Sequence, residues 1–156
     1  MHAIMLSAAK LKEGEKVLEI GAGSGILLAY SKEVVGNKGK VFGIEINKEA
    51  FDFANQNLKK SGYDKKVKLI LGDGSLGLSR YAPYDKIISS ASCDEIPKAW
   101  INQLKQGGIL ITPVGHSSGR QELLYAEKTK SGKLIKKEIG GVVFVNLQGK
   151  YGWKSS

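Results

Sequence analysis

The sequence has 156 residues, 42% of them hydrophobic and 25% charged, and its formal net charge is +9. These values are typical of one globular domain that buries a core of its own. No apolar run approaches the roughly 20 residues that a membrane helix needs, and the start of the sequence lacks the pattern of a signal peptide, so we expect one cytoplasmic domain over residues 1–156.

The first predicted element is a helix over residues 2–12, where apolar side chains recur at helical spacing. It is expected to end at Glu13-Gly14 and to pack beside the first strand. That strand is the short apolar run that begins at Val17 and then breaks into glycines at alternate positions. Such a pattern is typical of a strand, a tight turn and the start of a helix, here predicted over residues 26–35.

The three glycines of this turn are Gly21, Gly23 and Gly25. Glycine takes positive φ freely and leaves its backbone bare, so the loop is suited to close approach by a small ligand. A dinucleotide fingerprint would place its third glycine at the position of Ile26, so NAD or FAD fits less well. Taken alone, the loop is also compatible with a purely structural turn.

A second strand is predicted over residues 40–46, and Glu45 near its end lies twenty residues beyond Gly25. In doubly wound α/β folds an acid at the tip of the second strand accepts hydrogen bonds from ribose hydroxyls. Glu45 is therefore a candidate for that role. Together with the glycine loop it favours a nucleotide-like ligand over a structural turn.

The next helix should begin after Asn47, as its N-cap, and end at Ser61-Gly62. A third strand over residues 66–71 runs into Gly72-Asp-Gly-Ser-Leu-Gly77. An acid at the carboxyl end of a parallel strand lies on the ligand edge of the sheet, so Asp73 is a candidate acceptor for an adenine amino group. Taken alone, an ordinary Asp-Gly turn is the better interpretation.

The second half of the chain predicts a strand over residues 84–91, a helix over 97–105 that Gly107-Gly108 ends, and a strand over 109–114. Residues 123–126 and 134–145 have no helix between them, so they should form an antiparallel hairpin around Ser131-Gly132. The predicted fold class is α/β: a doubly wound, Rossmann-like sheet of about seven strands, mostly parallel, with a C-terminal antiparallel hairpin and helices on both faces.

The C-terminal part of the chain is basic, with lysines at 128, 130, 133, 136, 137, 150 and 154 against Glu127 and Glu138. Such a region can attract nucleic acid or an anionic protein, but lysines that keep a hairpin edge soluble are the simpler explanation. Cys93 cannot form an internal disulfide and is interpreted as a packing residue. With His2 and His116 it gives too few groups for a metal site or a Ser-His-Asp triad, so neither is predicted.

Several of these motifs together resemble the protein-L-isoaspartate O-methyltransferase family over residues 2–153. The resemblance is carried by residues 16–27, 39–45, 72–77 (GDGSLG), 82–85 (APYD), 103–108 and 112–115 (TPVG). The glycine loop is shared by S-adenosylmethionine-dependent methyltransferases at large, whereas the later motifs in this order are more specific. The resemblance implies S-adenosyl-L-methionine as cofactor. It also implies methyl transfer to the α-carboxyl of isoaspartyl residues in damaged peptides and proteins, which initiates their repair.

The resemblance also implies cofactor contacts, but it names no catalytic residue. The methionine part of the cofactor would lie at Glu19 and the loop, the ribose and adenine at Glu45 and Ile46, and the adenine edge at Asp73 and Gly74. The full set is Glu19, Gly21, Ala22, Gly23, Gly25, Glu45, Ile46, Asp73, Gly74, His2 and Gln148. The family carries a Thr-Ile-Ser segment ahead of this region, and the sequence starts at Met1 just after it. We therefore expect residues 1–156 to bind cofactor but to methylate isoaspartyl peptide weakly.

Two other functions stay open at this point. A nucleic-acid methyltransferase is favoured by the net charge, but residues 89–94 read SSASCD where amino-methylating DNA enzymes carry an Asn/Asp-Pro-Pro-Tyr box. This disfavours the class and leaves RNA or tRNA base methylation as the alternative. A non-catalytic cofactor-binding domain is the second alternative. The sequence gives no indication of oligomeric state.

Overall fold

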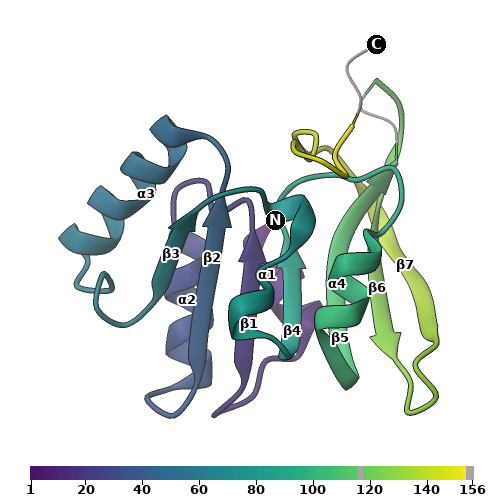
Figure 1. Ribbon diagram of the computed structural model, residues 1–156, viewed down its shortest axis with the longest axis horizontal. Helices are drawn as coiled ribbons and strands as arrows, with labels where there is room; N and C mark the ends of the chain where they lie inside the picture. The colour runs from purple at the N-terminus through teal and green to yellow at the C-terminus, as the bar shows by residue number, and fades with distance from the viewer. Residues whose placement is uncertain (116–117, 154–156) are drawn as a thin grey trace.

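The computed structural model describes residues 1–115 and 118–153, so His116 and Lys154 lie outside the described residues. One seven-stranded sheet runs through the molecule, with helices packed on both sides (Figure 1). In chain order the elements are α1 (His2–Ala9), β1 (Lys16–Ile20), α2 (Ile26–Val35), β2 (Lys40–Glu45), α3 (Lys48–Lys60), β3 (Lys68–Leu71), the 3-10 turns η1 (Gly74–Leu76) and η2 (Ser79–Tyr81), β4 (Tyr84–Ser89), α4 (Lys98–Gln103), β5 (Leu104–Gly115), β6 (Gln121–Lys128) and β7 (Leu134–Val142).

The strand order is β3-β2-β1-β4-β5-β6-β7. Strands β1 to β5 pair in parallel, and β6 runs antiparallel to both β5 and β7. The predicted doubly wound sheet with a C-terminal antiparallel hairpin is therefore confirmed. The order reverses at β1 and β4, whose carboxyl ends lie side by side, and this is the place where open α/β sheets bind ligands.

Alternation along the central strands divides the core into two layers. Val17 and Ile88 face one apolar cluster, which also contains side chains of α1, α2 and α3. Leu18 and Ile87 face the other cluster, which contains Trp100 of α4. Because successive strand residues point to opposite faces, the continuous apolar runs of β1 and β4 require helices on both sides of the sheet.

Helix α1 differs from its prediction in both length and partner. It ends at Ala9, three residues early, because Lys10 adopts a left-handed conformation (φ 50°, ψ 49°) and its N–H bonds back to the carbonyls of Leu6 and Ser7. It packs against β5 and β4, whereas the prediction placed it beside β1. Helix α2 already covers β1 and β2 on that face, so α1 takes the neighbouring position.

The boundary between α4 and β5 was also predicted wrongly. Helix α4 stops at Gln103 and β5 starts at Leu104, so Gly107-Gly108 lie inside the strand rather than between two elements. The pairing of β4 with β5 shifts between Tyr84 and Lys86, and Gly107 takes a φ of +76° at this irregularity. The glycine pair thus serves to bend the strand. In the sequence alone, such a pair cannot be distinguished from one that ends a helix.

The remaining differences are at strand ends. Strands β2, β3, β4 and β7 are each shorter than predicted by one to three residues, and β6 is longer. For β4 the reason is local: the Ser89 hydroxyl accepts from the N–H of Ala91 at 3.2 Å and donates to the carbonyl of Ala91 at 2.8 Å. The side chain thus closes a turn directly after the strand, two residues before the predicted end.

Candidate cofactor site at the carboxyl edge of the sheet

The glycine loop lies between the end of β1 and the start of α2, as predicted. Gly21, Gly23 and Gly25 all have positive φ, at +78°, +54° and +81°. At Gly25, the N-cap of α2, an added Cβ would lie 3.2 Å from the Leu58 side chain of α3, so both conformation and space require glycine there. The loop is therefore bare backbone that starts a helix, which is the geometry that suits an approaching ligand.

Glu45 ties the second strand to this loop. Its Oε2 accepts a hydrogen bond from the N–H of Gly23 at 3.0 Å, and its Oε1 accepts from the N–H of Asn47 at 2.9 Å. Asn47 itself caps α3 by accepting from the N–H of Ala50 at 2.9 Å, as predicted. These contacts hold the carboxyl group in one orientation at the tip of β2, with lone pairs left for further donors. Ile46 follows it with 40% of its surface exposed.

Glu19 is the most unusual group of the site. It belongs to β1, only 2% of its surface is exposed, and its Oε2 has no hydrogen-bond partner among the described residues. Burial raises the pKa of Glu19 well above its usual value, and the negative charge of Glu45 raises it further, while the nearby Ser90 hydroxyl opposes the rise. A buried, unsatisfied carboxyl beside a glycine loop is a group that a bound cation would satisfy.

Asp73 follows β3 on the same edge of the sheet, and its carboxylate is already engaged. Oδ1 accepts from the N–H and the hydroxyl of Ser75 at 2.9 and 2.6 Å, and Oδ2 accepts from the N–H of Lys150 at 2.8 Å. Partial burial alone would raise the pKa of Asp73, but these hydrogen bonds outweigh it and lower the pKa. Gly74 beside it is buried, and its carbonyl accepts from Nε1–H of Trp100 at 2.9 Å.

The partner of Asp73 comes from the end of the described chain, residues 145–153, which we name the C-terminal strap. The strap is held at the loop after β4, where Ser92 bonds through its backbone to Val145 and Leu147 and accepts from Nε1–H of Trp153. It is also held after β3, where the N–H of Tyr151 donates to the Ser75 hydroxyl at 3.0 Å. The strap therefore crosses the carboxyl edge of the sheet.

The structure brings most of the sequence-derived candidates to one edge. Glu19, the glycine loop, Glu45 and Asp73 stand at the carboxyl ends of three adjacent strands, β1, β2 and β3. Gln148 is exposed within the strap, two residues before Lys150, whose N–H donates to Asp73, and His2 is exposed at the start of α1. Sequence reasoning missed the strap, because its contacts join residues 76 and 77 positions apart. Its glycines at 149 and 152 between Leu147 and Trp153 are the signal that could have indicated a packed turn.

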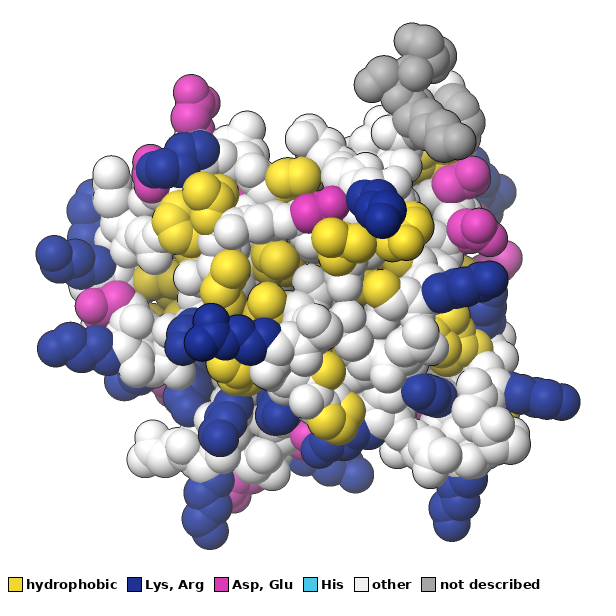
Figure 2. All heavy atoms as spheres, in the orientation of Figure 1, with side chains coloured by type: hydrophobic (Ala, Val, Ile, Leu, Met, Phe, Trp, Pro, Cys, Tyr) yellow, Lys and Arg dark blue, Asp and Glu magenta, His cyan; other side chains and the backbone are white. Residues whose placement is uncertain are grey.

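Most of the positive charge on one face of the molecule lies away from this edge (Figure 2). On the face in view, most lysine and arginine side chains lie along the lower and left margins, near the amino ends of the parallel strands (Figure 2). Hydrophobic side chains gather nearer the centre and the upper part of the same face. On this face, the positive charge is therefore concentrated near the amino ends of the strands and not at their carboxyl ends.

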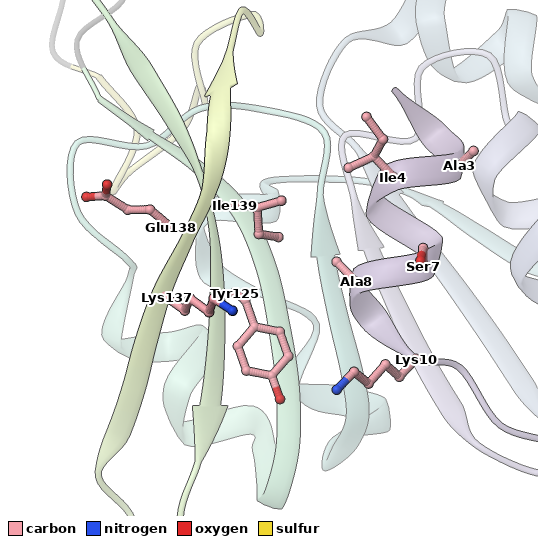
Figure 3. Close-up of a pocket in the computed structure, with 9 residues that line it drawn as sticks. All are labelled: Ala3, Ile4, Ser7, Ala8, Lys10, Tyr125, Lys137, Glu138 and Ile139. Carbon is pink, nitrogen blue, oxygen red and sulfur yellow. The ribbon is translucent and has the colours of Figure 1, made fainter.

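A separate groove of about 660 Å³ lies between α1 and the β6–β7 hairpin (Figure 3). Its lining residues are Ala3, Ile4, Ser7, Ala8, Lys10, Tyr125, Lys137, Glu138 and Ile139. None of them belongs to the glycine loop or to the ends of β1, β2 and β3, so this groove is distinct from the candidate cofactor site.

Metal binding and thiol chemistry are the two other candidate chemistries in the described part of the chain. Within it, no group of three or more His, Cys, Asp and Glu side chains could hold a metal ion. Cys93 is buried, and burial raises the pKa of its thiol to about 11, so the thiol is protonated at neutral pH and packs as a small apolar group. Among the described helices, none is long and apolar enough to cross a membrane.

Comparisons with known proteins agree with this geometry. The family model for protein-L-isoaspartate(D-aspartate) O-methyltransferase matches residues 1–152. A protein-L-isoaspartate O-methyltransferase of Methanococcus aeolicus is 51% identical over 153 residues, which are 98% of this chain and 69% of that protein. One of Pyrococcus abyssi is 49% identical over 154 residues, which cover 99% of this chain and 70% of the relative.

Solved structures of the same kind are also similar. A protein-L-isoaspartate O-methyltransferase superposes with a TM-score of 0.88 at 32% identity, over 97% of this chain and 47% of that chain. A putative protein-L-isoaspartate O-methyltransferase from Plasmodium falciparum, in complex with S-adenosyl-L-homocysteine, gives a TM-score of 0.84 at 26% identity, over 95% of this chain and 73% of that chain. The chain thus spans about half to seven tenths of the proteins it matches.

Proposed function

The chain belongs to the protein-L-isoaspartate(D-aspartate) O-methyltransferase family, and from this premise we propose that residues 1–156 act as one S-adenosylmethionine-binding domain. The proposed reaction transfers a methyl group to the α-carboxyl of L-isoaspartyl residues in damaged peptides and proteins. The observation that supports it best is the joint position of the glycine loop, Glu45 and Glu19 at the switch point of the sheet.

The residues at this edge fit the cofactor. The unpartnered Oε2 of Glu19 is suited to an ammonium group, and the fixed carboxylate of Glu45 is suited to the hydroxyls of a ribose. Asp73 keeps an acceptor site for an amino group at the edge of the purine. Ile46 offers exposed apolar surface beside Glu45 for the face of the base.

Methyl transfer to a carboxylate requires little acid–base catalysis by the protein. The cofactor, when bound, supplies a methyl group on a positively charged sulfur. A carboxylate acceptor with a pKa near ~3.9 is already ionised at neutral pH, so no general base is needed. The chain's own residues therefore bind and orient, and orientation alone can lower a barrier of this kind by roughly 7–11 kcal/mol.

The compartment is part of the same proposal. Cys93 is the one cysteine of the sequence and it is buried as a free thiol, which fits a reducing environment. We propose the cytoplasm, where aged proteins with isoaspartyl residues would be the substrates.

The test is a methylation assay with labelled S-adenosylmethionine and two peptides that differ only in having isoaspartyl or aspartyl at one position. Label should enter the isoaspartyl peptide selectively, as a base-labile methyl ester. At subsaturating cofactor, Glu45→Ala should lower incorporation, whereas the exposed Glu49→Ala in the first turn of α3 should not change it. Incorporation into a tRNA pool and not into the peptide would refute the proposed substrate.

A further inference from the structure

Two carboxyl groups of this site, Glu45 and Glu19, have contrasting environments. Glu45 has one backbone N–H donor on each oxygen, from Gly23 and from Asn47. Glu19 is 2% exposed, and its Oε2 has no partner among the described residues. Ionising both carboxyl groups has a high free-energy cost, because the charge on Glu19 would be desolvated by burial and repelled by Glu45.

We infer that Glu19 carries a proton in the free protein and releases it to solvent when the α-ammonium of the cofactor binds. The step balances as a neutral carboxylic acid plus an ammonium ligand giving a carboxylate–ammonium pair plus one proton taken up by the buffer. Glu19 is then the group that receives the cation, and Glu45 is the group that keeps Glu19 neutral until the cation arrives. This inference rests on the proposed function, since it assumes that the site takes S-adenosylmethionine.

Other charged groups near β1 have partners or lie in solvent, so they do not neutralise Glu19. Lys86 of β4 faces Glu15 at 3.5 Å, and Lys32 of α2 donates to the carbonyls of Gly36 and Gly39. Glu33 of α2 accepts from the Tyr63 hydroxyl at 2.5 Å. His2 of α1, Tyr30 of α2 and Lys40 of β2 are exposed. Besides burial, which has the largest effect, Glu45 raises the pKa of Glu19 from the neighbouring strand, and the Ser90 hydroxyl after β4 opposes the rise without cancelling it.

The sign of the effect on binding follows from linkage. Burial and Glu45 raise the pKa of Glu19 in the free protein, and a bound ammonium lowers it. Between these two values binding releases up to one proton, so affinity rises with pH by up to about tenfold per pH unit. Above the free-protein value the dependence disappears.

The experiment is calorimetric titration with S-adenosylhomocysteine, which carries the same α-ammonium and no sulfonium, in three buffers of different ionisation enthalpy at pH 6, 7 and 8. The slope of the observed enthalpy against the buffer enthalpy counts the protons released. The wild-type protein should release a substantial fraction of one proton. Glu49→Gln, an exposed control in α3, should release the same fraction, and Glu19→Gln should release none.

The possible outcomes are distinct. Absence of any binding by the wild-type protein contradicts the proposed function itself. Binding without proton release, or release that persists in Glu19→Gln, overturns the inference and leaves the proposed function standing. If Glu19→Gln does not fold, carboxyl-carbon NMR of the free wild-type protein answers the same question, because a Glu19 resonance that is already ionised at pH 6 refutes the inference.

Discussion

Glu45 at the end of β2 accepts a hydrogen bond from the N–H of Gly23, with 3.0 Å between Oε2 and N. This contact joins residues 22 positions apart and fixes the glycine loop to the second strand before any ligand arrives. The loop and the carboxylate therefore form one preorganised unit. Preorganisation lowers the entropic cost of ordering the loop when a ligand binds.

The first prediction concerns that unit. Glu45→Ala removes the acceptor for the ribose and for Gly23, so cofactor affinity should fall by on the order of 1–3 kcal/mol, roughly fivefold to 150-fold. Calorimetry with S-adenosylhomocysteine measures the loss, with Glu49→Ala as the matched control. Equal affinity of Glu45→Ala and the parent would show that the ribose lies elsewhere.

The second prediction concerns the C-terminal strap. Gly149 has a φ of +105°, and a Cβ there would overlap the carboxylate of Asp73. Gly132 in the hairpin turn also has positive φ, at +83°, but its Cβ would meet open space. Gly149→Ala should therefore detach the strap from Asp73, whereas Gly132→Ala should bear only backbone strain of about 1–2 kcal/mol.

Amide hydrogen exchange at Lys150 and Tyr151 reports this directly, since both N–H groups donate across the strap. Exchange should accelerate in Gly149→Ala and stay slow in Gly132→Ala, and urea unfolding should show the larger destabilisation for Gly149→Ala. Unchanged protection at Lys150 would mean that the strap accommodates the methyl group by moving as a whole.

Local sequence patterns were sufficient for the parts of this site that depend on local geometry. The alternate glycines predicted a positive-φ loop, and the position of Glu45 placed an acid at the tip of the adjacent strand. The burial and the raised pKa of Glu19 could not be predicted, because they depend on how strands and helices that are distant in sequence exclude water from this side chain. For the same reason the strap was not predicted and the partner strand of α1 was predicted wrongly, since spacing within a segment does not indicate which other segment it contacts.

A third prediction links Glu19 to folding stability. Its pKa is raised in the folded protein, whereas an unfolded glutamate titrates near ~4.3, so the native state holds a proton that the unfolded state has lost. The contribution of Glu19 to stability is thus fully present below the unfolded pKa and is lost as pH rises toward the folded pKa. Asp73 has the opposite sign, because hydrogen bonds lower its pKa: its contribution is present above its unfolded pKa and is lost as pH falls through its folded pKa.

The difference in unfolding free energy between wild type and Glu19→Gln isolates the contribution of Glu19, since the glutamine stays neutral at every pH. Urea unfolding from pH 4 to pH 8 should show Glu19→Gln gaining stability relative to wild type as pH rises. A constant difference over this range would mean that Glu19 titrates normally in the folded protein.

The last prediction concerns the basic hairpin. Lys136 and Lys137 lie on β7, and Lys133 precedes it in the turn. Strands β4, β5 and β6 separate β7 from β1 in the sheet, so at about 4.8 Å per strand these lysines stand roughly 19 Å from the first strand. That exceeds the Debye length of about 10 Å at 0.1 M salt, so their field at the cofactor site is largely screened.

Changing all three lysines to glutamine should leave cofactor affinity within about twofold. Any binding of tRNA by the wild-type protein should be weak and salt-sensitive. Fluorescence anisotropy with labelled tRNA at two salt concentrations, beside calorimetry with S-adenosylhomocysteine, measures both. Tight tRNA binding that resists salt and vanishes in the triple variant would contradict the solubility explanation for these lysines and favour a nucleic-acid substrate.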